Sequence, residues 1–192
     1  MQDIFDITMK HVLEAEGLYA NVKGDSGGET WRGVSRVSNP YWPGWRLVDA
    51  VKEAGHTSAE AINRQLRDDQ KLNLFVRELY RERYWDPLAR WLEGRVLAKV
   101  FDAGVNMGVQ PAVRLLQQAL NHHPLDAGLA VDGVLGPRTA EAAKAAPEDK
   151  LLMNYRQAQT SRYIKIAEKP ENRKFLPGWL NRAAWLPPKE AA

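Results

Sequence analysis

Apolar side chains recur along most of the chain at the three- and four-residue spacing of amphipathic helices. The first such segment covers residues 4–16, and Gly17 gives it a natural end. Its apolar face is made by Phe5, Met9, Val12 and Glu16. Further helical patterns cover 46–54, 58–69, 70–84, 94–107, 111–121, a segment that opens at Pro137, and 148–168. No long alternating segment predicts a large sheet, so the pattern indicates a mainly α fold.

A glycine-rich segment follows the first helix. Glycines at positions 17, 24, 27, 28 and 33 exclude a regular helix over residues 17–35. We therefore expect a long irregular loop there, with a short hairpin as the regular alternative.

Composition removes several classes of chemistry. The 192 residues contain no cysteine, which excludes disulfides, a thiol nucleophile and cysteine-ligated metals. The four histidines are not spaced as a zinc-binding pair, so we expect no metal and no cofactor. No apolar segment approaches the ~20 residues of a membrane helix. The N-terminus has acidic residues where a secretory signal has a basic flank. We therefore expect no transmembrane segment and no signal peptide.

Charge is distributed unevenly along the chain. The net charge is +3, but residues 150–192 carry 9 basic and 3 acidic side chains. A basic C-terminal segment suits an anionic polymer or surface, although a solvated helix face has the same pattern. No nucleic-acid-binding module accompanies it, so we do not expect nucleic acid as a partner.

Glu16 is a candidate general acid. It lies on the apolar face of its helix and in the last turn, where burial and the negative end of the helix dipole both disfavour the ionised carboxylate. Glu14 lies away from that face and should be an ordinary solvated acid. The alternative for Glu16 is a frayed helix end with its side chain in water.

Asp25 is a second candidate carboxyl group, nine residues later in the glycine-rich loop. In a polar setting it would stay ionised, and two carboxyl groups in contrasting environments are the ingredients of glycoside hydrolysis. The alternative is an Asp that caps a turn. Aromatic residues gather around the same loop. Tyr19, Trp31 and Trp42 could therefore contact sugar faces, although a tryptophan often belongs to the core.

The motifs of this first half resemble those of the glycoside hydrolase family 108 muramidases. Glu16-Gly17-Leu18-Tyr19 is similar to the family's E-G-G-Y element, with Leu18 in place of the second glycine. The other similar blocks are Asp25-Ser26-Gly27-Gly28-Glu29-Thr30, Gly33-Val34-Ser35, Tyr84-Trp85-Asp86-Pro87 and Phe101 to Gly108. The resemblance implies a lysozyme-like helical fold and cleavage between N-acetylmuramic acid and N-acetylglucosamine. It puts the essential acid at Glu16, and places Asp25, Thr30 and Asn106 at the substrate.

The second half resembles the peptidoglycan-binding segment that accompanies this family. Leu116 to Leu120 and Val131 to Thr139 follow its L-Q-x-x-L and D-G-x-x-G-x-x-T patterns. The resemblance makes Asp132, Gly133, Gly136 and Thr139 candidates for glycan contact, although Asp-Gly and Gly-Pro are also good turn formers. We predict a catalytic segment over 1–90 and a binding segment over 91–192, packed into one compact body.

These observations predict an N-acetylmuramidase of the phage endolysin type, which degrades bacterial peptidoglycan and causes lysis. We expect a monomer that stays in the host cytoplasm until it is released to the periplasm or cell wall. The alternatives are a bacterial muramidase that assists secretion through the wall, a lytic transglycosylase, and a peptidoglycan-binding module without turnover. The distance between the two catalytic carboxyl groups decides whether hydrolysis retains or inverts the anomeric centre, and the sequence does not give this distance.

Overall fold

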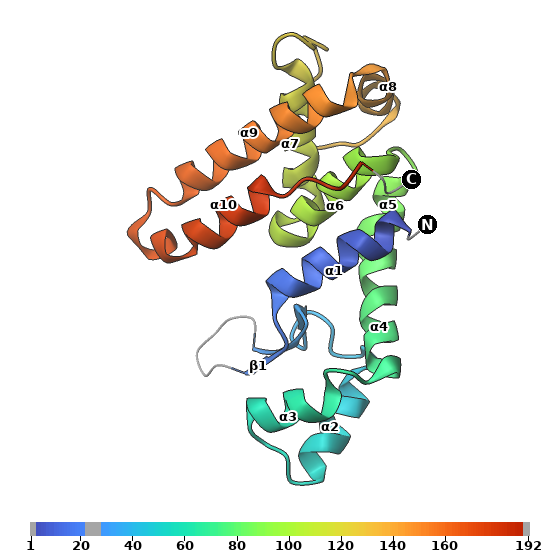
Figure 1. Cartoon of the computed structure of the whole chain (residues 1–192), viewed down its shortest axis with the longest axis vertical. Helices are drawn as coiled ribbons and strands as arrows, with labels where there is room; N and C mark the ends of the chain where they lie inside the picture. Colours follow the sequence, from blue (N-terminus) through green and yellow to red (C-terminus); the bar gives the residue numbers. More distant parts are fainter. Residues whose placement is uncertain (1–2, 22–27, 190–192) are drawn as a thin grey trace. The chain divides into compact units, whose positions relative to one another are not determined.

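The computed structural model describes residues 3–21 and 28–189 (Figure 1), and its regular structure is mostly helical. In chain order the elements are α1 (Ile4–Glu16), β1 (Tyr19–Asn21), β2 (Glu29–Trp31), β3 (Val34–Ser35), α2 (Trp45–Glu53), α3 (Ala59–Leu66), α4 (Gln70–Tyr80), the π-helical η1 (Arg81–Trp85), α5 (Asp86–Ala89), α6 (Gly94–Met107), α7 (Val109–Asn121), α8 (Pro137–Ala145), α9 (Glu148–Ile166), the 3-10 helix η2 (Pro170–Phe175) and α10 (Leu176–Ala184). The predicted mainly α fold, with a short hairpin after the first helix, is confirmed.

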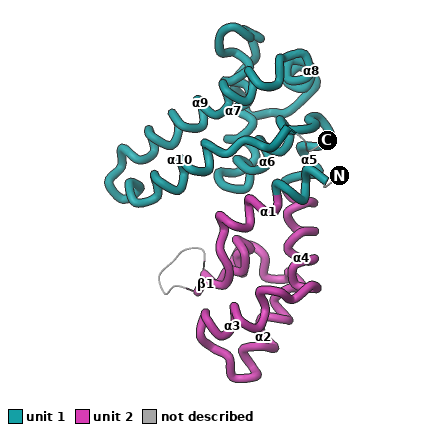
Figure 2. Tube along the Cα trace, in the orientation of Figure 1, with its two compact units in different colours: residues 1–8, 84–192 teal, residues 9–83 magenta. Residues whose placement is uncertain are grey.

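The chain divides into two compact units (Figure 2). One is formed by residues 9–83, and the other by residues 1–8 together with 84–192. We refer to them as the sheet unit and the helical unit. The predicted boundary at 90/91 lies a few residues beyond this division, and the packing of both segments into one body stays a prediction.

The sheet unit contains a three-stranded antiparallel sheet in the order β1-β2-β3. Tyr19 pairs with Trp31 across the first two strands, and Trp31 pairs with Val34 across the next two. Arg32 and Gly33 form the two-residue turn between β2 and β3, and both have positive φ, at 45° and 78°. Such a turn matches the twist of the flanking strands, which is why a glycine stands at its second position.

Helix α4 is shorter than the pattern predicted. A regular helix was expected over 70–84, but the α-helix ends at Tyr80 and the chain widens into η1. The reason is Pro87, which lies in the first turn of α5 and has no N–H to donate to the carbonyl one turn earlier. The sequence pattern detected the apolar face correctly, because Leu72, Val76 and Tyr80 are all buried.

The helical unit is built around α6, in which every residue from Arg95 to Gly104 is buried. Two charged side chains lie in that run. Asp102 accepts a hydrogen bond from the Arg182 guanidinium of α10 at 2.8 Å. Lys99 donates to the carbonyl oxygens of Arg182, Ala183 and Trp185 at the end of α10. These bonds satisfy the carbonyl groups that a helix leaves unpaired at its C-terminus, and they fix α10 against α6.

Candidate active site

Glu16 is the last residue of α1 and its side chain is half-buried. The carboxyl group lies beside the turn between β2 and β3. A Cβ atom built on Gly33 would stand 2.9 Å from Glu16 Oε2 and would overlap the Tyr80 hydroxyl group. Only a glycine therefore lets the turn approach this closely. The helix end and the hairpin turn together hold the Glu16 carboxyl group in place.

Tyr80 supports the same turn from α4. Its side chain is 3% exposed, and its hydroxyl group donates a hydrogen bond to the Arg32 carbonyl oxygen at 2.9 Å. The two atoms belong to residues 48 positions apart in the chain. Because the residue lies on a regular helical face, the sequence pattern marked it only as part of the core. Tyr80 is a positioning residue that sequence reasoning missed.

Thr30 lies in the middle of β2, between the buried Trp31 and the half-buried Glu29. Successive side chains of a strand point to opposite faces, so Thr30 is turned away from both neighbours. Its side chain is half-buried, and its hydroxyl group lies 3.5 Å from the Ala20 carbonyl oxygen on β1. Thr30 is therefore accessible on the sheet face opposite the core. Asp25, the other predicted catalytic residue, lies outside the described residues.

Trp31 and Tyr19 serve the core of the sheet unit. Trp31 is 0% exposed and Tyr19 is 8% exposed. The prediction that Trp31 forms a wall of a sugar-binding cleft is wrong for this reason, since a fully buried ring has no face to stack on a sugar. The aromatic composition could not reveal this, because strand alternation decides which face of the sheet each ring joins.

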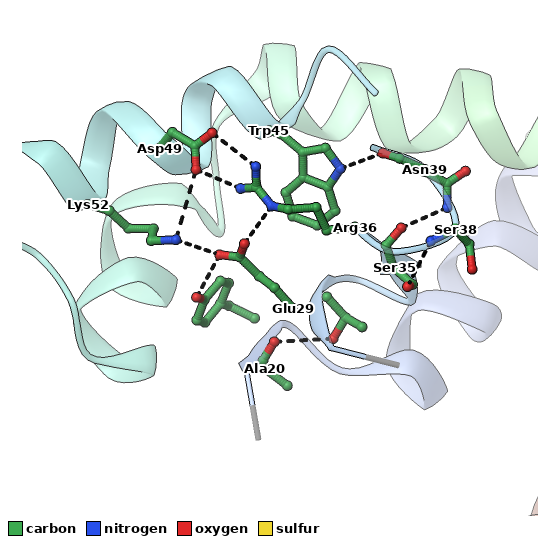
Figure 3. A network of polar contacts seen from close by, with 11 residues as sticks. Ala20, Glu29, Ser35, Arg36, Ser38, Asn39, Trp45, Asp49 and Lys52 are labelled. Atoms are coloured by element: carbon green, nitrogen blue, oxygen red, sulfur yellow. Dashed lines mark hydrogen bonds and ion pairs between the residues drawn. The ribbon is translucent and has the colours of Figure 1, made fainter. Parts of the chain in front are cut away.

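The Tyr19 hydroxyl group instead donates to Glu29 Oε1 at 2.8 Å, within a network of charged side chains (Figure 3). Lys52 from α2 donates to the same oxygen at 2.9 Å, and Arg36 pairs with Glu29 Oε2. Arg36 also donates to both carboxylate oxygens of Asp49, at 2.6 and 3.1 Å. The network ties β1 and β2 to α2 and thereby fixes the strand that carries Thr30.

The network also determines protonation. Burial raises the pKa of Tyr19 to about 12, and the bond to Glu29 acts in the same direction. Burial opposes the ionised form of Glu29, but hydrogen bonds from Lys52 and Tyr19 and the positive charges of Arg36 and Lys52 outweigh it and lower the pKa. Glu29 thus stays ionised, and its carboxylate oxygens are bonded to Tyr19, Lys52 and Arg36. Glu29 is therefore a structural carboxylate.

Trp42 borders a cavity of about 450 Å³ in the sheet unit. Its indole N–H donates to the Phe75 carbonyl oxygen at 3.3 Å, and the side chain is 7% exposed. The neighbouring Tyr41 is 96% exposed and lines the same cavity. An aromatic cavity of this size can take a sugar ring, so a substrate contact at Trp42 stays a prediction.

Asn106 lies near the end of α6, in the helical unit. Its Oδ1 atom accepts a hydrogen bond from the Tyr163 hydroxyl group at 2.8 Å, and Gln159 Nε2 donates to the same hydroxyl group at 3.1 Å. The side chain is half-buried, so part of the amide stays accessible. The structure thus places Asn106 in a different unit from Glu16, and substrate contact there stays a prediction.

Three of the four motif residues, Asp132, Gly133 and Thr139, lie within hydrogen-bond distance of Gln117 of α7. The Gln117 amide donates to Asp132 Oδ1 at 2.7 Å and to the Val134 carbonyl oxygen at 3.1 Å, and it accepts from the Gly133 N–H at 2.9 Å. Gly133 has a φ of 80°, and a Cβ atom there would collide with Gln110. Thr139 is 5% exposed. These contacts make the motif a locked turn, and its polar groups are largely used inside the protein.

A small cavity of about 220 Å³ lies beside this turn and is lined by Asp132, Gly136 and Thr139 among others. The hydrogen bonds of the turn already give these residues a structural function. Peptidoglycan contact at these residues therefore stays a prediction. In the part of the chain that the structure describes, no three His, Asp or Glu side chains are placed to hold a metal ion. The helices of that part include none with the length and hydropathy of a membrane span.

Comparison with known proteins defines the class. Residues 9–108 match the family model described as Glycosyl hydrolase 108, and residues 111–184 match the model described as Predicted Peptidoglycan domain. The protein is therefore a glycoside hydrolase that acts on peptidoglycan. Because the first match covers more than half of the chain, the chain belongs to the Glycosyl hydrolase 108 family.

A solved structure shows the same fold. The "Structure of Brucella abortus SagA" superposes with a TM-score of 0.62 at 24% sequence identity, over 94% of this chain and 89% of that chain. No match is found among curated proteins. The predicted lysozyme-like helical fold and the predicted order of a hydrolase segment followed by a peptidoglycan segment are both confirmed.

Proposed function

We propose that the protein hydrolyses the bond between N-acetylmuramic acid and N-acetylglucosamine, with Glu16 as the general acid. The observation that carries this proposal is the position of Glu16. A half-buried carboxyl group ends a rigid helix and is held against a hairpin turn that has no side chain at the point of contact. A general acid must be held within hydrogen-bond reach of the leaving oxygen, and this arrangement supplies that rigidity.

The chemistry needs a second group on the other side of the bond. Glu16 donates its proton to the glycosidic oxygen as the bond breaks, and an oxocarbenium-like centre develops on the sugar. We assign the support of that centre, or of the attacking water, to Asp25. Glu29 cannot take this part, since Tyr19, Lys52 and Arg36 already occupy its carboxylate oxygens. Thr30 is assigned to substrate positioning.

The cellular role that we propose is lysis by a phage-type endolysin with bacteriolytic activity. The enzyme would act once it reaches the wall from the cytoplasm. Expression with and without a holin in a Gram-negative host tests this role. Lysis only with the holin is expected, whereas wall remodelling without lysis in either case would favour a muramidase that assists secretion.

The reaction is tested by mass spectrometry of the fragments that are released from purified peptidoglycan. We expect reducing N-acetylmuramic acid ends from the wild type and a rate about 10²–10⁴-fold lower from Glu16→Gln, which is the usual contribution of a general acid. Glu14→Gln is the matched control, because Glu14 is exposed on the same helix. Anhydro ends would identify a transglycosylase, and wild-type turnover by Glu16→Gln would exclude Glu16 as the acid.

Asp25→Asn completes this set. If Asp25 supports the reacting centre, the variant loses turnover but still binds the wall. Equal loss of binding and turnover would make Asp25 a structural residue of its loop. If neither the wild type nor the variants release fragments, while all of them remain bound to the wall, the protein is a binding module without turnover.

A further inference from the structure

The helical unit contains a second cavity, of about 400 Å³, between the turn that joins α5 to α6 and the helix α8. It lies apart from the Gln117 turn and from all the residues assigned above to the reaction. Its volume falls within the range of sites for small ligands, which is roughly 300–1,000 Å³. The cavity therefore has the size of a ligand site and no role in the hydrolysis described so far.

The floor of this cavity is apolar, and the cavity exists because small side chains leave it unfilled. Leu92 and Val96 are buried beneath it, and Ala140 and Ala143 on α8 contribute only methyl groups. Larger residues at the two alanine positions would fill the space. At the rim stands Trp91, which is 40% exposed although it lies next to buried residues. An exposed tryptophan beside an apolar floor is a common anchor of binding sites.

The rim also carries charges of both signs. Arg90 and Lys144 supply positive charge, Glu93 and Glu141 supply negative charge, and none of the four forms an ion pair with another residue of the described ranges. Glu148, which borders the same cavity, differs because Arg95 holds it at 3.0 Å. Four such charges around an aromatic and apolar floor can bind a ligand that has both ammonium and carboxylate groups.

We propose that this cavity binds the peptide stem of peptidoglycan, a short peptide with free carboxylate and ammonium groups. The glycan strand is a weaker fit, because its neutral sugar rings would leave the charged rim unused. The choice of peptidoglycan as the source of the peptide rests on the proposed function. The ligand chemistry, a short zwitterionic peptide, rests on the cavity alone.

The test measures binding of the free tetrapeptide L-Ala-γ-D-Glu-meso-diaminopimelate-D-Ala to the full chain by isothermal titration calorimetry. Ala140→Leu, which fills the cavity, should weaken binding at least about tenfold, because the larger side chain occupies the space that the peptide would take. Ala145→Leu is the matched control, since Ala145 is exposed on the same helix and does not line the cavity. Unchanged affinity in Ala140→Leu would overturn the proposal.

A peptide with amidated carboxylates tests whether Lys144 contacts a carboxylate group of the ligand. Lys144→Gln should weaken the tetrapeptide about tenfold, in line with a charge-assisted bond, and should have no effect on a peptide whose carboxylates are amidated. Lys150→Gln, an exposed change outside the cavity, should leave both affinities unchanged. An equal effect of Lys144→Gln on both peptides would contradict the assigned contact.

The two proposals can fail separately. Tetrapeptide binding that Ala140→Leu abolishes, in a protein that releases no fragments from peptidoglycan, would remove the proposed reaction and keep this site. Fragment release without tetrapeptide binding would do the reverse. An N-acetylglucosamine tetramer serves as the glycan probe. If the wild type binds this tetramer but not the peptide, and Ala140→Leu no longer binds the tetramer, the cavity is a sugar site and the peptide assignment is overturned.

Discussion

At the scale of single residues, the candidate site depends on Gly33, because a side chain at this position would collide with its neighbours. Gly33 has a φ of 78°, a conformation that favours glycine, and it lies where the Glu16 carboxyl group and the Tyr80 hydroxyl group meet the hairpin turn. Tyr80 fixes the turn through the Arg32 carbonyl oxygen. The position of the proposed acid is thus set by α1, by the turn and by α4 together.

Gly33→Ala should lower turnover about 100-fold, because a misplacement of about 1 Å at a reacting group can cost that much. The new Cβ atom would displace Glu16 Oε2, which lies 2.9 Å from its position. The strained φ should also cost about 1 kcal/mol of stability. Fragment release and denaturant unfolding measure the two effects.

The control for this variant is Gly55→Ala. Gly55 has a φ of 93° with nothing within 4 Å of the added Cβ atom. It should therefore show only the loss of stability that the strained φ causes, with wild-type turnover. A Gly33→Ala enzyme as active as this control would show that the turn does not position Glu16.

At the scale of secondary structure elements, single buried side chains connect segments that lie far apart in the sequence. Gln117 joins α7 to the turn that begins at Asp132 through three short hydrogen bonds. Lys99 joins α6 to the end of α10 through three more. In both cases the polar group is buried and fully used, so its loss leaves several backbone or side-chain groups without a partner.

Gln117→Ala should destabilise the helical unit by about 1 kcal/mol, the usual net worth of hydrogen bonds whose partners water can reach after the change. Urea unfolding measures the change. Gln118→Ala is the control, because Gln118 is the exposed neighbour on the same helix. Equal stability of the two variants would mean that the turn does not depend on Gln117.

Lys99 predicts a dependence of stability on pH. Burial lowers the pKa of Lys99 from 10.5 to about 8. Between these two values the unfolded chain binds the proton and the folded chain does not, so the free energy of unfolding should rise with pH, by at most about 3 kcal/mol. Below pH 8 the cost of burying the charge remains in full.

Unfolding of the wild type between pH 7.5 and 9.5 should show this rise, and Lys99→Met should lack it. The buried Tyr19, Tyr155 and Tyr163 also have raised pKa values, but they oppose the rise only from about pH 10 upward, where an unfolded tyrosine ionises. Lys165→Met, an exposed change on α9, should keep the wild-type profile. A flat wild-type profile would contradict the prediction.

At the scale of the whole molecule, charge is segregated along the chain. Residues 150–192 carry a net charge of +6, and residues 1–90 carry a net charge of −1. Many of the basic side chains are exposed on α9 and η2, among them Lys165, Arg173 and Lys174. This part of the chain should therefore attract anionic cell-wall polymers over a distance that salt determines.

Adsorption of the Glu16→Gln protein to purified walls should fall as the ionic strength rises. At low salt, the double variant Arg173→Gln/Lys174→Gln should adsorb less than the double variant Arg46→Gln/Lys71→Gln. Both pairs are exposed and remove the same charge, but the second lies in the sheet unit. Equal adsorption would show that net charge matters and its location does not.

Much of the fold could be predicted from the sequence, because helices are encoded by local periodicity. The helices over residues 4–16 and 94–107 have the predicted bounds. The deviation at α4 arose where Pro87 changes the hydrogen-bond pattern of the preceding turn. Glu16 was also predicted from local information, since its place on the apolar face and in the last turn follows from the helix alone.

The functions of the polar and aromatic residues required the tertiary structure. The sequence determined the helices, the family motifs and the proposed acid, all of which depend on residues close together in the chain. Only the fold decided that Trp31 is buried and that Tyr80 supports the turn beside Glu16. It likewise decided that Gln117 occupies the motif at Asp132. The physical reason is that these contacts join residues 15 or more positions apart, and local periodicity does not encode which distant partners meet.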